Sequence, residues 1–140
     1  MTRPADPAGG SFKVRTCLWF DGNGREAAEF YVSLLPDSFV ETEAAGDSLH
    51  AKYVVEFTLA GTPYMTLDGG PNYPHTPAAS ISVLTDDQEE TDRLWAALTA
   101  DGGAESKCGW LTDRFGVSWQ IVPRAMPGFL ASDDRAAAGR

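Results

Sequence analysis

The stretch that decides the fold lies late in the chain and reads Asp113-Arg-Phe-Gly-Val-Ser-Trp-Gln-Ile-Val122. A glycine-containing turn leads into a strand in which Ser118 and Gln120 alternate with apolar neighbours. This period of two is typical of a strand in a sheet that has one apolar and one polar face. The pattern predicts that one face packs in a core and that the other carries small polar side chains.

A second strand, expected over residues 79–84, repeats this pattern. Ser80 and Ser82 fall on one side of it, whereas Ile81 and Val83 fall on the other. Two strands that each carry hydroxyl or amide groups on one face favour a pocket built on a sheet. The alternative is that these polar side chains simply face solvent, where serine and glutamine are usually found.

Composition sets the class of protein. The chain has 140 residues, which suits one domain, and its 43% hydrophobic content suffices for a packed core. A net charge of −9 disfavours a nucleic-acid partner, because such partners require a basic surface. No apolar run reaches the roughly 18 residues of a membrane span, and residues 1–10 lack the apolar part of a signal peptide. We therefore expect a cytoplasmic protein with no membrane or nucleic-acid partner, in which Cys17 and Cys108 are reduced thiols.

Apolar residues at helical spacing occur twice, over residues 25–35 and 86–99, and Thr85-x-x-Gln88 has the pattern of a capping box. Short strands surround these segments, so the order strand-helix-strand-strand-strand is found twice, on either side of a Pro- and Gly-rich loop at 68–77. Each helix should cover the apolar face of its own sheet. The sequence predicts an α+β fold of two βαβββ modules in one domain at 13–123. Their expected bounds are about 13–70 and 78–123, between a disordered tail at 1–12 and a second tail at 124–140.

Several motifs resemble those of a known family. They are Cys17-Leu-Trp-Phe-Asp-Gly22, Glu26-Ala-Ala-Glu-Phe-Tyr31, Gly69-Gly-Pro71, Cys108-Gly-Trp-Leu111 and Trp119-Gln-Ile-Val-Pro123. With the paired modules, they resemble the PhnB-like subgroup of the vicinal oxygen chelate superfamily, which includes glyoxalases, extradiol dioxygenases, and bleomycin and fosfomycin resistance proteins. The resemblance covers about Val14 to Pro123 and implies helices packed on the convex faces of a mixed sheet. It also implies a homodimer, since isologous pairs are the commonest oligomers.

Members of this subgroup are often labelled demethylubiquinone 3-methyltransferases. A nucleotide-type methyl donor usually sits in a doubly wound fold with a Gly-rich first turn. The turn Asp21-Gly-Asn-Gly24 is not followed by a parallel-sheet pattern of that kind. The sequence therefore does not predict methyl transfer.

Enzymes of the superfamily hold a divalent metal through His and Glu side chains, and the metal acts as a Lewis acid. The resemblance places Thr16, Ser80 and Gln120 at the corresponding positions. Neutral hydroxyl and amide groups are poor ligands for a divalent transition metal, and a shift to Arg15 or Cys17 does not improve the set. We expect neither a metal nor another cofactor.

The candidate ligand pocket combines the polar strand faces with residues near the last two strands. Trp110 would supply an aromatic wall for a flat organic ligand. Cys108 is either a pocket thiol or a structural buried cysteine, and no local histidine is present to activate it. Asp113 and Arg114 are expected to serve the turn, and three of the four tryptophans (Trp19, Trp95, Trp119) to lie in the core. The predicted pocket comprises Thr16, Ser80, Ser82, Cys108, Trp110, Ser118 and Gln120.

Two hypotheses of function follow. The first is an uncharacterised PhnB-like protein that binds a small organic molecule in a metal-free concave pocket. The alternative is a metal-dependent glyoxalase-like isomerase or lyase. The sequence identifies no catalytic residue, so it leaves enzymatic activity open.

Overall fold

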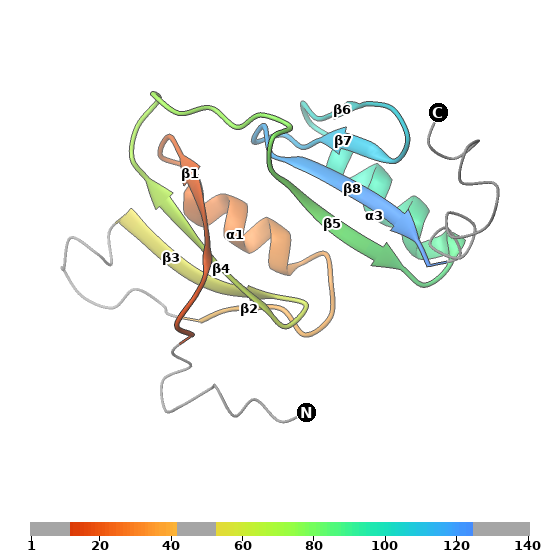
Figure 1. Ribbon diagram of the computed structural model, residues 1–140, viewed down its shortest axis with the longest axis horizontal. Coiled ribbons are helices and arrows are strands. Elements are labelled where there is room, and N and C mark those ends of the chain that lie inside the picture. Colours follow the sequence, from red (N-terminus) through yellow and green to blue (C-terminus); the bar gives the residue numbers. More distant parts are fainter. Residues whose placement is uncertain (1–11, 42–52, 125–140) are drawn as a thin grey trace. The chain divides into compact units, whose positions relative to one another are not determined.

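The computed structural model describes residues 12–41 and 53–124. The chain divides into two compact units, Met1–Pro74 and His75–Arg140, and the division falls inside the Pro- and Gly-rich loop (Figure 1). Of the two expected tails, at 1–12 and 124–140, only residues 12 and 124 are among the described residues. Each unit is described by itself below.

The first unit contains one described helix and a four-stranded sheet. Its elements are β1 (Thr16–Phe20), α1 (Gly24–Val32), β2 (Phe39–Val40), β3 (Val54–Leu59) and β4 (Thr62–Asp68). The strand order is β1-β4-β3-β2, in which β1 runs parallel to β4 and the other pairs are antiparallel.

The second unit repeats this topology. Its elements are β5 (Ser80–Thr85), α3 (Gln88–Thr99), β6 (Ala104–Glu105), β7 (Trp110–Thr112) and β8 (Ser118–Pro123). The strand order is β5-β8-β7-β6, and again only the first pair is parallel. The predicted α+β fold of two βαβββ modules is confirmed.

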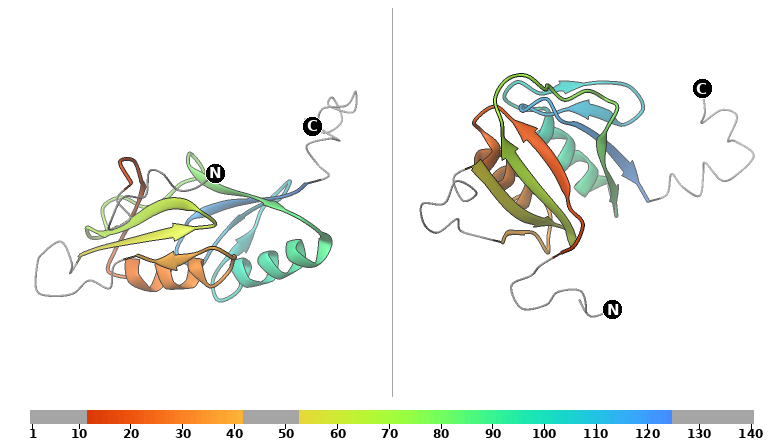
Figure 2. Two further views of the ribbon diagram at one scale, coloured as in Figure 1. Left: turned by 90° about the horizontal axis from the view of Figure 1, so that it is seen from below. Right: turned by 60° about the vertical axis from the view of Figure 1, so that its left-hand side comes forward.

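One face of each sheet is covered by the helix of the same unit (Figure 2). In the first unit, Tyr31 of α1 and Phe57 of β3 are fully buried, with ring centroids 6.2 Å apart. In the second unit, Leu94 and Leu98 of α3 are fully buried, as is Trp119 of β8. We call the opposite side of each sheet its helix-free face. Neither described helix is long and apolar enough to cross a membrane.

The start of α3 differs from the predicted capping box. The cap is Asp87, whose Oδ1 accepts a hydrogen bond from the Glu90 backbone N at 2.8 Å. Glu90 reaches back in turn, and its Oε1 accepts from the Asp86 backbone N at 2.8 Å. Thr85 still belongs to β5 and is buried there, with its Oγ1 2.6 Å from Thr91 Oγ1. The helix therefore begins two residues later than the capping box placed it, where a carboxylate caps its positive end.

Candidate functional site

The helix-free face of the second unit carries the polar side chains that the alternation predicted. They form two rows across β5, β8 and β7, Ser80–Ser118–Thr112 and Ser82–Gln120–Trp110. Ile81, Leu111 and Trp119, which alternate with them, are at most 6% exposed and lie on the α3 side. Parity thus separates a core face from a polar face in this unit.

Ser80 and Gln120 come together on this polar face. The Gln120 Nε2 donates a hydrogen bond to the Ser80 Oγ at 2.9 Å, and both side chains are half-buried. Ser82 lies beside Gln120 on the neighbouring strand and is exposed. The structure therefore gathers Ser80, Ser82, Trp110, Ser118 and Gln120, five of the predicted site residues, on one face.

A tight turn leads into β7. The Trp110 backbone N donates to the Lys107 carbonyl O at 3.0 Å, and the two central residues both have positive φ, 56° at Cys108 and 82° at Gly109. These values define a type I′ turn, in which Asn or Gly is usual at the position that Cys108 occupies. The strand β7 begins only after this turn, at Trp110. Cys108 is exposed, so the alternative of a buried structural cysteine is wrong.

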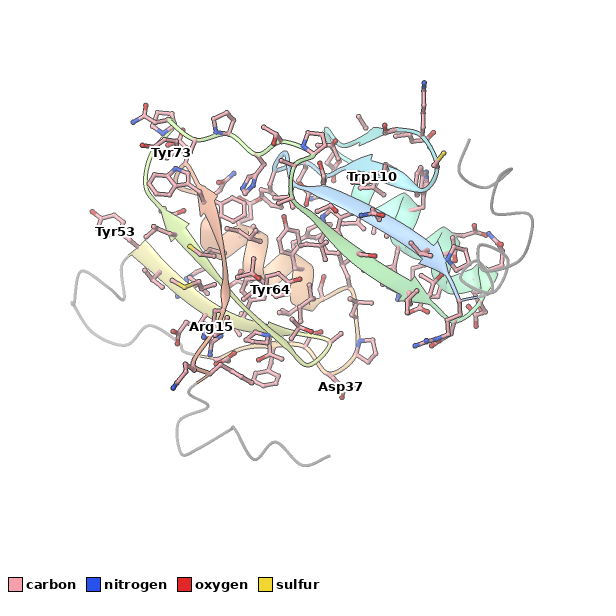
Figure 3. All side chains as sticks on the ribbon, viewed as in Figure 1. Arg15, Asp37, Tyr53, Tyr64, Tyr73 and Trp110 are labelled. Atoms are coloured by element: carbon pink, nitrogen blue, oxygen red, sulfur yellow. The ribbon has the colours of Figure 1, made fainter. Side chains whose placement is uncertain are left out.

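A pocket of about 400 Å³ opens beside this turn. Its lining residues all belong to the second unit and are Pro77, Ser106, Lys107, Cys108, Trp110, Leu111, Thr112 and Ser118. Trp110, at the start of β7, is half-buried (Figure 3). The volume falls within the range of roughly 300–1,000 Å³ that is typical of small-molecule sites. Of the predicted residues, Cys108, Trp110 and Ser118 line this pocket.

The hydroxyl groups that line the pocket make no hydrogen bond with the residues that the structure describes. Ser118 is only 3% exposed, yet its Oγ makes no hydrogen bond with any described residue. The hydroxyls of Ser106 and Thr112 likewise have no partner among the residues that the structure describes. The Ser118 hydroxyl therefore keeps its capacity to donate and accept hydrogen bonds for water or for a molecule in the pocket.

Five lining residues were not predicted from the sequence: Pro77, Ser106, Lys107, Leu111 and Thr112. Thr112 has the same parity as Trp110 in a short strand, which is a usable signal. Lys107 and Ser106 carry no such signal, because only the closure of the type I′ turn brings them to the pocket.

Thr16 does not join the polar face. It belongs to the first unit and shares strand parity with Leu18 and Phe20, which are 8% and 3% exposed. Those two residues lie on the face that α1 covers. The neighbours Cys17 and Trp19 therefore occupy the helix-free face of this sheet in its place.

The helix-free face of the first unit holds an ion pair that the protein satisfies itself. Arg15 donates from Nη1 to Glu41 Oε2 at 2.9 Å and from Nη2 to Glu41 Oε1 at 2.5 Å, and the two side chains are 7% and 8% exposed (Figure 3). Thr58 Oγ1 also donates to Glu41 Oε2, at 2.6 Å. The hydrogen bond from Arg15 to Glu41 raises the pKa of Arg15, which keeps the guanidinium charged.

Sulfur and aromatic groups fill the rest of this face. Cys17 lies beside Met65, and burial raises the pKa of the Cys17 thiol. Trp19 donates from Nε1 to the Gly70 carbonyl O at 2.8 Å. Its ring packs edge to face against the ring of Tyr73, with centroids 4.8 Å apart. A Cβ at Gly69 would overlap the Trp19 ring, which explains the glycine there. Trp19 is therefore half-buried on the helix-free face, not in the helix-covered core that was predicted for it.

The remaining sequence candidates have structural explanations. Asp113 is 2% exposed and accepts three hydrogen bonds, from the Phe115 and Val117 backbone N atoms at 2.8 and 3.0 Å and from Trp119 Nε1 at 2.8 Å. Its predicted role in the turn is confirmed. Trp119 lies in the core as predicted, whereas Trp95 is half-buried and donates to Glu105 Oε2 at 2.9 Å. Of the two histidines in the chain, neither of which was predicted to lie in the pocket, His75 is half-buried and His50 lies outside the described residues.

The donor groups do not fit a divalent metal. Within residues 12–41 and 53–124, no three His, Cys, Asp or Glu side chains come together as a metal site requires. Ser80 and Gln120, which the resemblance placed at metal-ligand positions, are neutral, and the Gln120 amide N donates to the Ser80 hydroxyl. An amide that donates a hydrogen bond and a serine hydroxyl are a weak donor set for a transition metal.

The chain is similar in sequence and in fold to known proteins. Residues 12–122 match the family described as 3-demethylubiquinone-9 3-methyltransferase. The chain belongs to this PhnB-like family. A Bacillus cereus protein described as a putative 3-demethylubiquinone-9 3-methyltransferase, PhnB protein, is 30% identical, with a TM-score of 0.65 over 80% of this chain and 99% of that one. Protein PA1353 from Pseudomonas aeruginosa is 26% identical, with a TM-score of 0.60 over 81% and 98% of the two chains.

More distant structures share the fold. The fosfomycin resistance protein FosX from Listeria monocytogenes is 11% identical, with a TM-score of 0.56 over 87% of this chain and 98% of that one. A glyoxalase/bleomycin resistance protein from Albidiferax ferrireducens T118 is 18% identical, with a TM-score of 0.50 over 78% and 97% of the chains. At these identities the likeness concerns the fold alone. No curated protein matches the chain.

Proposed function

We propose that this PhnB-like protein binds a small organic molecule, without a metal, in the pocket beside the type I′ turn of the second unit. The observation that supports the proposal most strongly is the Ser118 hydroxyl, which is 3% exposed, lines the pocket and has no partner among the described residues. A hydroxyl in that position gains a hydrogen bond when a ligand or a water molecule fills the space.

The other lining groups suit an organic ligand. The half-buried ring of Trp110 offers an apolar surface on which a flat molecule can stack. Ser106 and Thr112 add further hydroxyls that can fix its orientation. A mostly apolar wall with a few convergent polar groups is the usual composition of a small-molecule site. Ser80, Ser82 and Gln120, on the same face, extend the polar surface of the proposed site.

The methyl transfer in the family's description gains no support from the fold. The described strands form two mixed four-stranded sheets, not a parallel doubly wound sheet with a Gly-rich first turn. The alternative of a metal-dependent isomerase or lyase is opposed by the donor chemistry of Ser80 and Gln120. Metal analysis of the purified protein tests that alternative: stoichiometric zinc, nickel or manganese would favour it over metal-free binding.

A screen of small aromatic and aliphatic molecules, read by ligand-observed NMR, tests the binding proposal. At least one flat molecule is expected to bind the parent protein. The variant Trp110→Ala should weaken that binding about tenfold by removing one wall, a loss typical of one stacked contact. Ser118→Leu should abolish it by filling the pocket.

The matched control is Trp95→Ala, which removes a half-buried tryptophan from α3, away from the pocket lining. It should leave binding unchanged. Ligands that bind Trp110→Ala and Ser118→Leu as tightly as they bind the parent protein would contradict the proposed site.

We also propose that the protein is a homodimer, as the family resemblance implies and as closed two-fold pairs commonly are. Size-exclusion chromatography with light scattering at micromolar concentration should give twice the 15.0 kDa chain mass. A monomer mass under those conditions would contradict this part of the proposal.

A further inference from the structure

The charges around the pocket indicate which kind of ligand it takes. Lys107 is one of its lining residues, and no Asp or Glu is among them. This is unusual for a chain whose net charge is −9. A site that offers one ammonium group and no carboxylate favours an anion over a cation of the same shape.

Lys107 differs from two other cations of its unit, Arg114 and Arg124. Arg114 is paired with Asp101 at 3.3 Å, and Arg124 is paired with Asp86 at 2.5 Å. Lys107 forms no ion pair with any residue that the structure describes. Its charge is therefore not neutralised locally by a described carboxylate, and it stands at a pocket that has hydroxyl donors of its own.

We infer that the ligand is a flat, conjugated organic anion, of the aromatic carboxylate class. The ring would stack on Trp110, and the anionic oxygens would accept hydrogen bonds from Ser118 Oγ and the neighbouring hydroxyls. Lys107 would balance the charge at the pocket mouth. This inference rests on the proposed function and adds the chemical class of the ligand to it.

The hydroxyls make the pocket suited to an anion in a second way. A serine or threonine hydroxyl can rotate to donate, and hydrogen bonds to a charged oxygen are about twice as strong as those to a neutral one. The hydroxyls of Ser118 and Thr112 belong to directly paired residues of β8 and β7, so both can reach the same group. Neither has to give up a bond to a described residue in order to do so.

The test uses three probes of one shape and different charge: naphthalene-2-carboxylate, naphthalene-2-carboxamide and 2-naphthylmethylammonium. Affinities are measured by ligand-observed NMR titration at pH 7 in low salt. The carboxylate should bind about tenfold tighter than the carboxamide, a difference that one partly exposed charge can provide. The ammonium probe should bind most weakly. Raising the salt concentration should weaken only the carboxylate, because surface charges are screened.

The decisive variant is Lys107→Met, which keeps the length of the side chain and removes its charge. It should reduce carboxylate affinity to that of the carboxamide and leave carboxamide affinity unchanged. Arg93→Met is the matched control, because it removes one positive charge from α3 of the same unit, outside the pocket lining. It should alter neither affinity. Circular dichroism checks that both variants are folded.

Equal affinity for carboxylate and carboxamide, with no effect of Lys107→Met, would overturn the anion preference. The proposed function would survive that result, provided that carboxamide binding is still lost in Ser118→Leu. Failure of all three probes would also overturn the anion inference, whereas the wider screen would decide the proposed function independently. Carboxylate binding that persists in Ser118→Leu would show that the anion binds elsewhere, and would likewise overturn the inference.

Discussion

The two units share one topology, yet their helix-free faces differ in whether the protein satisfies its own polar groups. In the first unit, Glu41 accepts hydrogen bonds from both Arg15 and Thr58. In the second, the hydroxyl of Ser118, which lines the pocket, has no partner among the described residues. Repeating a fold therefore does not repeat a site. A sheet face becomes a candidate site where its polar groups are left to a molecule from outside.

The same contrast holds for the other residues of the two faces. Cys17, Trp19 and Met65 lie on the first face, and Trp19 and Met65 are large. Trp19 Nε1 already donates a hydrogen bond to the Gly70 carbonyl O. The corresponding strands of the second unit carry small side chains such as Ser80 and Ser82. Small residues leave space above a sheet, whereas large ones fill it.

The largest expected effect concerns the ion pair of the first unit. Replacing Arg15 by Met leaves the Glu41 carboxylate, 8% exposed, without its guanidinium partner. The free energy of unfolding should fall by about 3 kcal/mol, because breaking a buried pair strands a charge. Urea denaturation measures this loss. The double variant with Glu41→Leu should recover more than half of it, since it removes the stranded charge as well.

The matched change in the second unit is Gln120→Leu, which removes a half-buried polar group that makes one hydrogen bond, to Ser80. Its cost should be about 1 kcal/mol or less. If Gln120→Leu lowers the free energy of unfolding more than Arg15→Met does, the two faces do not differ in how far the protein pairs its own polar groups.

An intermediate effect is expected from building a metal site into the second face. Because Gln120 Nε2 lies 2.9 Å from Ser80 Oγ, the double variant Ser80→His with Gln120→Glu should place an imidazole and a carboxylate within reach of one cation. We expect it to bind Zn²⁺ or Ni²⁺ in calorimetric titration, with an affinity that the parent protein lacks. Each single variant should bind more weakly than the pair. A double variant with no gain would show that the two side chains do not converge in solution.

The polar face of the second unit could be predicted from the sequence, because polar and apolar residues alternate clearly at the start of its strands. In β5 and β8 the first residues alternate between polar and apolar, as Ser-Ile-Ser and Ser-Trp-Gln, so Ser80 and Gln120 were assigned to the correct face. In β1 the sequence Thr-Cys-Leu-Trp-Phe is apolar at nearly every position, so its parity gives no signal, and Thr16 was assigned to the wrong face. An edge strand with one ambiguous polar residue needs the register with β4 to orient it.

Local backbone geometry accounts for the other differences. Cys108 and Gly109 continue the apolar pattern toward Trp110 and therefore resemble strand residues, but the bond from Trp110 N to Lys107 O closes a turn there. Thr85 precedes a helix at the spacing of a capping box, but its side chain is buried at the end of β5, and Asp87 takes the cap. In both cases a different local hydrogen bond, from Trp110 N to Lys107 O or from Glu90 N to Asp87 Oδ1, forms in place of the predicted pattern.

The smallest expected effect compares the two cysteines, one on each unit. Burial raises the pKa of Cys17, so at any pH below that value a smaller fraction of it is thiolate, the reactive form, than in an ordinary cysteine. Cys108 is exposed at the tip of a turn. At pH 8, iodoacetamide should therefore alkylate Cys108 a few times faster than Cys17, as measured by intact mass on the variants Cys17→Ser and Cys108→Ser.

Two further measurements test this comparison of the cysteines: the pH dependence of the alkylation rate, and the effect of a pocket ligand on it. The alkylation rate of Cys17 should reach half its maximum at a pH above the usual thiol value of about 8.5, because its thiol loses the proton later. Naphthalene-2-carboxylate should slow the alkylation of Cys108, which lines the pocket, and leave that of Cys17 unchanged. Equal protection of both cysteines would mean that the probe acts on the whole protein and not on the pocket. Both cysteines are exposed, so faster alkylation of Cys17 would contradict the smaller thiolate fraction expected from its raised pKa.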